Sequence, residues 1–201
     1  MSAQGSSGLA FYAYRAMRGA LFVLIAFFAG YSMLVIYAYP HDHQQHLDQA
    51  AIAKIEARKL TMNDMDGNHL PPRPDPGQLN ANIAGVDAND NGIRDDVELA
   101  IFARYSTSTR IRAAELQYAM DLQIQLTEVF DPATWEAATK QNDRGFGCLY
   151  DTSNSGYPML EKEVEGLVLN TPDRIKQFES IEQYRVSYKL SSGPDCDIDR
   201  G

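Results

Sequence analysis

Residues 109–130, TRIRAAELQYAMDLQIQLTEVF, carry apolar side chains on two adjacent stripes of a helix. Spacings of three and four positions are typical of a helix, and two stripes indicate burial on more than one side. The segment therefore predicts the core helix of the fold. Its apolar positions are Ile111, Tyr118, Leu122, Leu126 and Val129 on one stripe, with Ala113, Leu116, Met120 and Ile124 beside it.

Further helices are predicted on both sides of this segment. Upstream, residues 95–105 show the same periodicity, and Ser106–Ser108 separates them from the core helix. Downstream, Asp131–Pro132 and Thr171–Pro172 each place a capping residue before a proline, an arrangement typical of a helix N-terminus. The helix after Pro172 is expected to continue to Tyr188.

A shorter amphipathic helix is predicted to start near Tyr157–Pro158, with Leu160, Val164, Leu167 and Val168 on its apolar face. No segment alternates apolar and polar residues for long enough to predict a sheet. The expected fold class is therefore all-α, with about five helices in the folded domain.

The twelve residues from Asp87 to Glu98, DANDNGIRDDVE, precede and open the first of these helices. Oxygen-bearing side chains at alternate positions, with glycine at the sixth, are typical of a loop wound around Ca²⁺. Asp90 and Asp96 are expected to point outward. The predicted calcium ligands are Asp87, Asn89, Asn91, the carbonyl of Ile93, Asp95 (directly or through water) and Glu98 with both oxygens.

Two other interpretations of this loop remain open. A turn rich in Asp and Asn could simply cap the following helix, because acidic residues favour a helix N-terminus. Magnesium is a poorer fit than calcium, because it prefers a small octahedral shell that retains water.

The loop resembles the EF-hand calcium loop. However, Pro72, Pro74 and Pro76 disfavour a regular helix before it, and its apolar residue, Ile93, stands at position 7 rather than 8. That spacing is closer to thrombospondin type 3 repeats, which bind calcium structurally. More widely, LPPRPDP, GVDANDNGIRDDVE, NTPDR and the late cysteine resemble small exported proteobacterial proteins of uncharacterised function, a likeness that implies no activity.

Residues 19–40 are predicted to form a transmembrane helix, because they carry no charge and are long enough to cross the hydrocarbon layer. Arg15 and Arg18 precede them, so the positive-inside rule places residues 1–18 in the cytoplasm. The predicted location is the bacterial inner membrane, in a single pass, with the C-terminal domain in the periplasm. A signal peptide cleaved near Gly30–Ser32 is the alternative.

The rest of the chain is divided by composition. We expect a juxtamembrane stalk over 41–69, a proline-rich linker over 70–80, the calcium-stabilised helical domain over 81–192, and a tail over 193–201. Cys148 and Cys196 are predicted to pair on the exported side, and two independent thiols are the alternative.

The charge of the chain limits its partners. The net charge is −9, all 27 acidic residues lie after residue 41, and two of the 18 basic residues lie before it. An acidic exported part argues against binding nucleic acid or anionic lipid surfaces, and suits cations or a basic partner.

Several weaker patterns have plain interpretations. His41, His43 and His46 could hold zinc or copper but are expected to lie in a solvated stalk. His69 has no obvious partner. Two groups resemble half calcium loops but are interpreted as turn and tail: Asp64, Asp66 and Asn68, then Asp195, Asp197 and Asp199. A third group, Glu161, Glu163 and Glu165, is expected to spread over a solvated helix surface.

The chain contains no nucleophile elbow, phosphate loop, zinc-helix or kinase motif. The sequence therefore favours a membrane-anchored calcium-binding protein without catalytic activity, which binds another envelope protein. The alternatives are a hydrolase-like enzyme whose site comes from distant residues, and a calcium-responsive regulator. Convergent titratable groups in a pocket would favour the enzyme, whereas an exposed apolar groove would favour binding.

Overall fold

The computed structural model describes the backbone of residues 6–190, 192 and 195–200, and the side chains of 12–37, 47–190, 192 and 195–199. The chain divides into two compact units, Met1–Leu47 and Asp48–Gly201. Helix α1 (Ser6–Ala57) contains most of the first unit and supplies the opening residues of the second.

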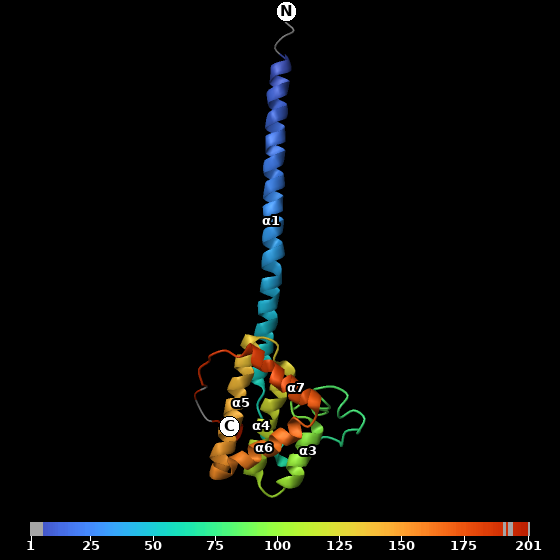
Figure 1. Cartoon of the computed structure of the whole chain (residues 1–201), viewed down its shortest axis with the longest axis vertical. Helices are drawn as coiled ribbons and strands as arrows, with labels where there is room; N and C mark the ends of the chain where they lie inside the picture. The colour runs from blue at the N-terminus through green and yellow to red at the C-terminus, as the bar shows by residue number, and fades with distance from the viewer. Residues whose placement is uncertain (1–5, 191, 193–194, 201) are drawn as a thin grey trace, which may run out of the picture. The chain divides into compact units, whose positions relative to one another are not determined.

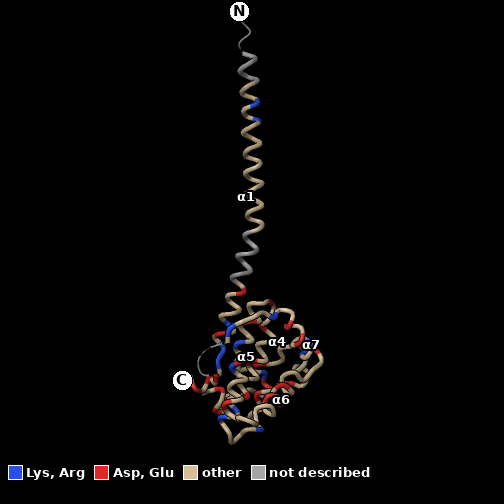
Figure 2. Tube along the Cα trace, turned by 60° about the vertical axis from the view of Figure 1, so that its left-hand side comes forward, with Lys and Arg blue, Asp and Glu red and all other residues tan. Residues whose placement is uncertain are grey.

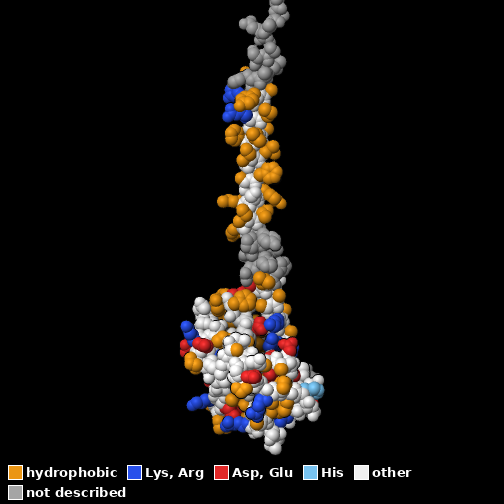
Figure 3. Space-filling model, turned by 90° about the vertical axis from the view of Figure 1, so that its right-hand side faces the viewer, with side chains coloured by type: hydrophobic (Ala, Val, Ile, Leu, Met, Phe, Trp, Pro, Cys, Tyr) orange, Lys and Arg blue, Asp and Glu red, His pale blue; other side chains and the backbone are white. Residues whose placement is uncertain are grey.

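In the first unit, α1 is long and apolar enough between Tyr12 and Tyr37 to cross a membrane. Figure 3 shows apolar side chains along the described part of this helix, with basic side chains near one end. A signal sequence near an N-terminus can also form an apolar helix of this length. The length and composition of α1 therefore show a helix that could span a membrane, without separating an anchor from a signal sequence. The predicted span, 19–40, overlaps it but starts later, because Arg15 and Arg18 do not interrupt the helix.

The regular elements of the second unit are all helices, its described residues contain no strand, and residues 67–94 between α2 and α3 form a long irregular segment. The prediction of an all-α fold is confirmed, although the sequence predicted fewer helices than the structure contains. The elements after α1 are α2 (Met62–Asp66), α3 (Asp95–Arg104), α4 (Thr109–Glu128), α5 (Pro132–Ser153), α6 (Tyr157–Val168) and α7 (Pro172–Ser180), with 3₁₀ turns η1 (Asn154–Gly156), η2 (Ile181–Tyr184) and η3 (Asp197–Arg200).

Helix α4 is the centre of the second unit. It contacts α2, α3, α5, α6 and α7, and Figure 1 shows it between α5 and α3. Every residue from Arg112 to Leu126 is buried, so the helix is enclosed on all sides, and the segment predicted to be the core helix does lie in the core. The helix therefore also encloses polar side chains, and both oxygens of Glu115 and Oδ2 of Asp121 have no hydrogen-bond partner among the described residues.

The proline signals place the later helices correctly. Asp131 Oδ1 accepts the Thr134 N–H at 2.7 Å, and α5 begins at Pro132. Thr171 Oγ1 accepts the Arg174 N–H at 3.2 Å, and α7 begins at Pro172. These side chains satisfy N–H groups that have no partner inside the helix.

The last predicted helix is too long. Helix α7 ends at Ser180 and one 3₁₀ turn follows. Residues 185–190, which include Tyr188, are not helical. Tyr188 donates to Asp143 Oδ2 at 2.7 Å and packs edge-to-face on Trp135 at 5.8 Å between ring centroids. These tertiary contacts hold the segment against α5, and they outweigh its local helical spacing.

The folded unit begins well before the predicted proline-rich linker. Ile55, Leu60 and Met65, in the segment expected to be a stalk, are buried in the core. Arg112 of α4 donates to the Met65 carbonyl at 2.6 Å. Their spacing is not helical, because α1 ends at Ala57 and the chain turns, so the periodicity did not reveal this contribution.

The end of the chain is also part of the core rather than a tail. Cys196 is joined to Cys148 of α5, and both are buried, which confirms the predicted disulfide. The neighbouring Asp197 is ion-paired with Arg144, and its Oδ2 accepts the Leu60 N–H at 2.9 Å. The disulfide thus holds a buried carboxylate of the C-terminal segment against α5 and against Leu60, near the start of the folded unit.

Candidate calcium loop and neighbouring cavities

The first half of the loop is folded around the carboxylate of Asp87. Its oxygens accept the N–H groups of Asn91 at 3.2 Å and Gly92 at 2.9 Å. Gly92 has φ +86°, and a Cβ there would collide with the Arg58 guanidinium. Glycine at the sixth position therefore serves both the turn and the close approach of Arg58.

The second half of the loop closes onto its start. The Asp95 N–H donates to the Val86 carbonyl at 2.8 Å, and the Ala88 N–H donates to Asp95 Oδ1 at 2.9 Å. Between them, Asn91 Oδ1 accepts the Ile93 N–H at 2.9 Å, and the Ile93 side chain is fully buried. The apolar residue at position 7 thus anchors the loop in the core.

Glu98, on the first turns of α3, faces back toward the loop. Its Oε2 accepts the amide N–H groups of Asn91 at 3.0 Å and Asn89 at 3.3 Å, and only 1% of the residue is exposed. Burial raises the pKa of Glu98 to about 7, although the two amides oppose the shift.

The other two loop carboxylates share this environment. Burial raises the pKa of Asp87 and of Asp95, and neighbouring acidic residues add to both shifts. Asp95 is fully buried, and its Oδ2 has no hydrogen-bond partner among the described residues. Buried oxygens without a partner are uncommon, and a cation would satisfy this one.

The loop fits a calcium ion in donor type, but its carboxylates are not gathered for one. Hydrogen bonds join Asn89, Asn91 and Glu98, while Asp87 and Asp95 bind backbone N–H groups. Within the described residues, no three His, Cys, Asp or Glu side chains are close enough to hold a metal. Two of the predicted ligands are asparagines, whose amides here direct nitrogen rather than oxygen toward Glu98.

Two buried arginines, Arg94 and Arg174, support the loop, and neither was expected from the sequence. Arg94 bonds the carbonyls of Val168 at 3.1 Å and Leu167 at 2.8 Å at the end of α6. Its Nε also pairs with Asp96 at 2.5 Å, so Asp96 does not simply point outward. Arg174 lies beside it and bonds the chain before the loop, from Leu79 to Ile83. Neither Arg94 nor Arg174 belongs to a sequence pattern that predicts hydrogen bonds to distant backbone carbonyls.

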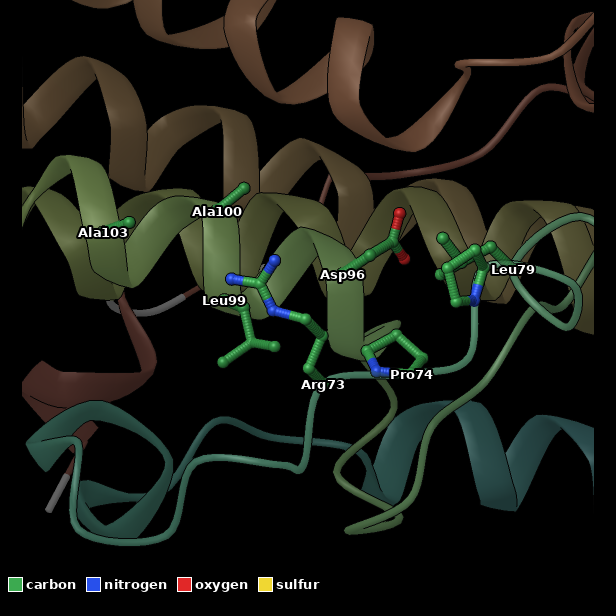
Figure 4. Close-up of a pocket in the computed structure, with 8 residues that line it drawn as sticks. Arg73, Pro74, Leu79, Asp96, Leu99, Ala100 and Ala103 are labelled. Carbon is green, nitrogen blue, oxygen red and sulfur yellow. The ribbon is translucent and has the colours of Figure 1, made fainter.

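An apolar groove lies between the proline-rich segment and α3, with a volume of about 350 Å³. Leu99, Ala100 and Ala103 of α3 form one side, and Pro74 and Leu79 belong to the other (Figure 4). Arg73 also lines the groove, and among the described residues it makes no hydrogen bond or ion pair. The predicted linker thus forms one wall of a groove beside the loop.

A second group of carboxyl groups lies between α4 and α6. Glu115 is fully buried, and burial together with the nearby charge of Glu163 raises its pKa to about 8. Glu163 is itself largely buried, pairs with Arg104 at 2.5 Å and accepts the Tyr105 hydroxyl at 3.0 Å. The expectation that Glu163 lies on a solvated surface is wrong, because α3 packs over it.

The weaker sequence patterns do not form sites in the described residues. Asp66 accepts the Asn68 N–H at 2.7 Å, a local turn, and lies 3.8 Å from His69 Nδ1. Asp197 is buried in an ion pair rather than exposed in a tail. The side chains of His41, His43 and His46 lie outside the described residues.

Comparisons with known proteins give no relative for this chain. No family model, curated protein or solved structure matches it. The class that the described residues define is a small all-α domain with an N-terminal apolar helix and one disulfide. Acidic residues, red in Figure 2, are distributed over the domain.

Proposed function

We propose that this chain is a membrane-anchored, extracytoplasmic calcium-binding protein that acts as a structural or interaction module without catalytic activity. The observation that carries the proposal is Asp95, a fully buried carboxylate with one unpartnered oxygen inside a closed loop. The raised pKa values of Asp87 and Glu98 support it, because a bound cation offsets the cost of burying negative charge.

The ion would be held by side chains already in the loop. Asp87, Asn89, Asn91, Asp95 and Glu98 supply side-chain oxygens and Ile93 its carbonyl, which suits the oxygen shell of calcium. Both asparagines would present oxygen in place of the nitrogen that now faces Glu98. By linking the loop to the first turns of α3, the ion would act as a structural staple.

The anchor is the apolar part of α1, from Tyr12 to Tyr37. With Arg15 and Arg18 near its start, the positive-inside rule favours a cytoplasmic N-terminus and a domain outside the cytoplasm. The disulfide between Cys148 and Cys196 supports an oxidising compartment. We therefore propose a bacterial inner-membrane location with the domain in the periplasm.

The groove on α3 is the surface we assign to a partner. Its apolar sides and the Arg73 guanidinium, which makes no ion pair among the described residues although Asp96 also lines the groove, suit an apolar polypeptide segment that carries a carboxylate. A photo-crosslinker at Ala103, in intact cells, should give one adduct that Arg73→Glu abolishes. A crosslinker at Asp151 should give none. Equal adducts from Ala103 and Asp151 would show that the groove is not the surface that binds the partner.

A calcium-responsive regulator is the second candidate. One helix, α3, supplies Asp95 and Glu98 to the loop and Leu99 and Ala103 to the groove. An ion that fixes its first turn would also set the position of the groove wall. Dependence of the Ala103 adduct on calcium would favour this candidate over a purely structural staple.

The calcium proposal is tested by thermal unfolding of the full chain in detergent. Extracellular modules bind with Kd of about 10⁻⁴–10⁻³ M, and ligand at 100 times Kd adds about 2.7 kcal/mol of stability. Calcium should raise Tm more than equal magnesium. The increase should be absent in Asp87→Ala and unchanged in Asp151→Ala, an exposed control. An equal increase in Asp87→Ala would rule out this loop as the site.

A further inference from the structure

A cavity of about 360 Å³ lies where the chain after α7 crosses α5, away from the calcium loop. Three aromatic side chains line it: Trp135, Phe178 and Tyr188. Trp135 and Tyr188 meet edge-to-face, with ring planes at 75°. Because the rings are fixed against each other, they offer a rigid apolar surface to whatever enters.

Three neutral polar side chains of this cavity have no hydrogen-bond partner among the described residues. Gln125, Thr139 and Asn142 line it, and none of these side chains makes a hydrogen bond to the described residues. Gln125 is only 6% exposed, and Oδ1 of Asn142 is buried and unsatisfied. A buried amide oxygen without a partner is uncommon, and a ligand that both donates and accepts hydrogen bonds would suit these three side chains.

The rim of the cavity carries no net charge. Glu182 and Arg185 line it and form an ion pair with each other. No uncompensated cation or anion therefore selects a charged ligand here. The site combines aromatic faces with neutral amide and hydroxyl groups.

We propose that this cavity is a binding site for a neutral saccharide. A pyranose ring has one face of C–H groups, which packs on an aromatic ring, and an edge of hydroxyls, which both donate and accept hydrogen bonds. Trp135 and Tyr188 supply the aromatic surface, and Gln125, Thr139 and Asn142 the hydrogen-bonding groups. Small-molecule pockets measure about 300–1,000 Å³, so this cavity suits a mono- or disaccharide.

The test uses the fluorescence of Trp135, which is the only tryptophan in the chain. The full chain, in a detergent without a sugar headgroup, is titrated with glucose, N-acetylglucosamine and a disaccharide of each. Glycerol and a neutral tripeptide serve as comparison ligands. We expect a saturable change in emission with at least one saccharide, and none with glycerol or the peptide.

Two variants remove the polar contacts while keeping side-chain size. Asn142→Leu and Thr139→Val should each weaken saccharide binding, Asn142→Leu by about ten-fold or more, equivalent to about 1.4 kcal/mol. Tyr150→Ala, half exposed and outside the cavity, should bind as the parent does. Thermal unfolding establishes that each variant is folded.

Several results would overturn the proposal. These are no saturable change with any saccharide, an equal change with glycerol, preferential binding of the tripeptide, or unchanged affinity in both variants. If Asn142→Leu raises Tm and the parent binds no saccharide, the cavity holds only water. Calcium binding at the loop is measured by a different experiment, so a negative result with saccharides does not contradict the calcium proposal.

Discussion

The side-chain amide of Asn91 donates a 3.0 Å hydrogen bond to Oε2 of Glu98, which ties the middle of the loop to the first turns of α3. The same carboxylate oxygen accepts Asn89. An ion in the loop would replace these N–H groups as the partner of Glu98. The partner of the Glu98 carboxylate, either the two amides or an ion, therefore determines whether the loop binds calcium.

Gly92→Ala should destabilise the chain. The residue has φ +86°, and an added Cβ would displace Arg58, so we expect a loss of about 1–3 kcal/mol. Gly166→Ala is the control, because it lies in α6 with open space around it and should gain about 0.5–1 kcal/mol. Urea unfolding measures both. Equal effects of the two substitutions would contradict the described turn.

Arg174→Met should weaken the chain before the loop. The guanidinium donates to the carbonyls of Leu79, Asn82 and Ile83 in part-buried hydrogen bonds, and its loss leaves these acceptors without that donor. We expect a loss of about 2–4 kcal/mol, with faster hydrogen exchange over 79–85. Lys176→Met, at an exposed position on the same helix, should change little. Unaltered exchange in Arg174→Met would refute this role.

Glu115 should make stability depend on pH. Its pKa rises from 4.5 to about 8 on folding, so the folded state holds a proton that the unfolded state releases. Stability therefore falls as pH rises from about 4.5, and the full penalty is present above about 8. Glu115→Gln should flatten this part of the profile, as measured by urea unfolding between pH 5 and 9. An unchanged slope would show that Glu115 is not the group involved.

Reducing the disulfide should destabilise the domain by about 2–5 kcal/mol. Cys148 and Cys196 close a loop with a sequence separation of 48, and the second cysteine precedes Asp197, the partner of Arg144. Limited proteolysis should then cut near the C-terminus first. If the reduced chain is cut no faster, the C-terminal segment is held by its other contacts.

The helices were predictable because their signals are local. The Asp131 and Thr171 caps and the two apolar stripes of residues 109–130 depend on short-range spacing, and the structure places helices there. The N-terminal apolar helix was predictable for the same reason.

What the sequence did not reveal depends on tertiary contacts. Leu60 and Asp197 meet across 137 positions, and neither lies in a periodic segment. Glu163 is buried because Arg104 and Tyr105 of a separate segment cover it. For the loop, the sequence specified oxygen-bearing residues at the right offsets. How closely they converge depends on Arg58, Arg94 and the core around Ile93.

Calcium binding by the loop is measured by calorimetric titration of the full chain with calcium, beside the variants Glu98→Gln and Asp151→Ala. We expect one calcium per parent chain, with a Kd of about 10⁻⁴–10⁻³ M, the same binding in Asp151→Ala, and none in Glu98→Gln. No heat of binding in the parent chain, or the same titration in Glu98→Gln, would contradict this expectation.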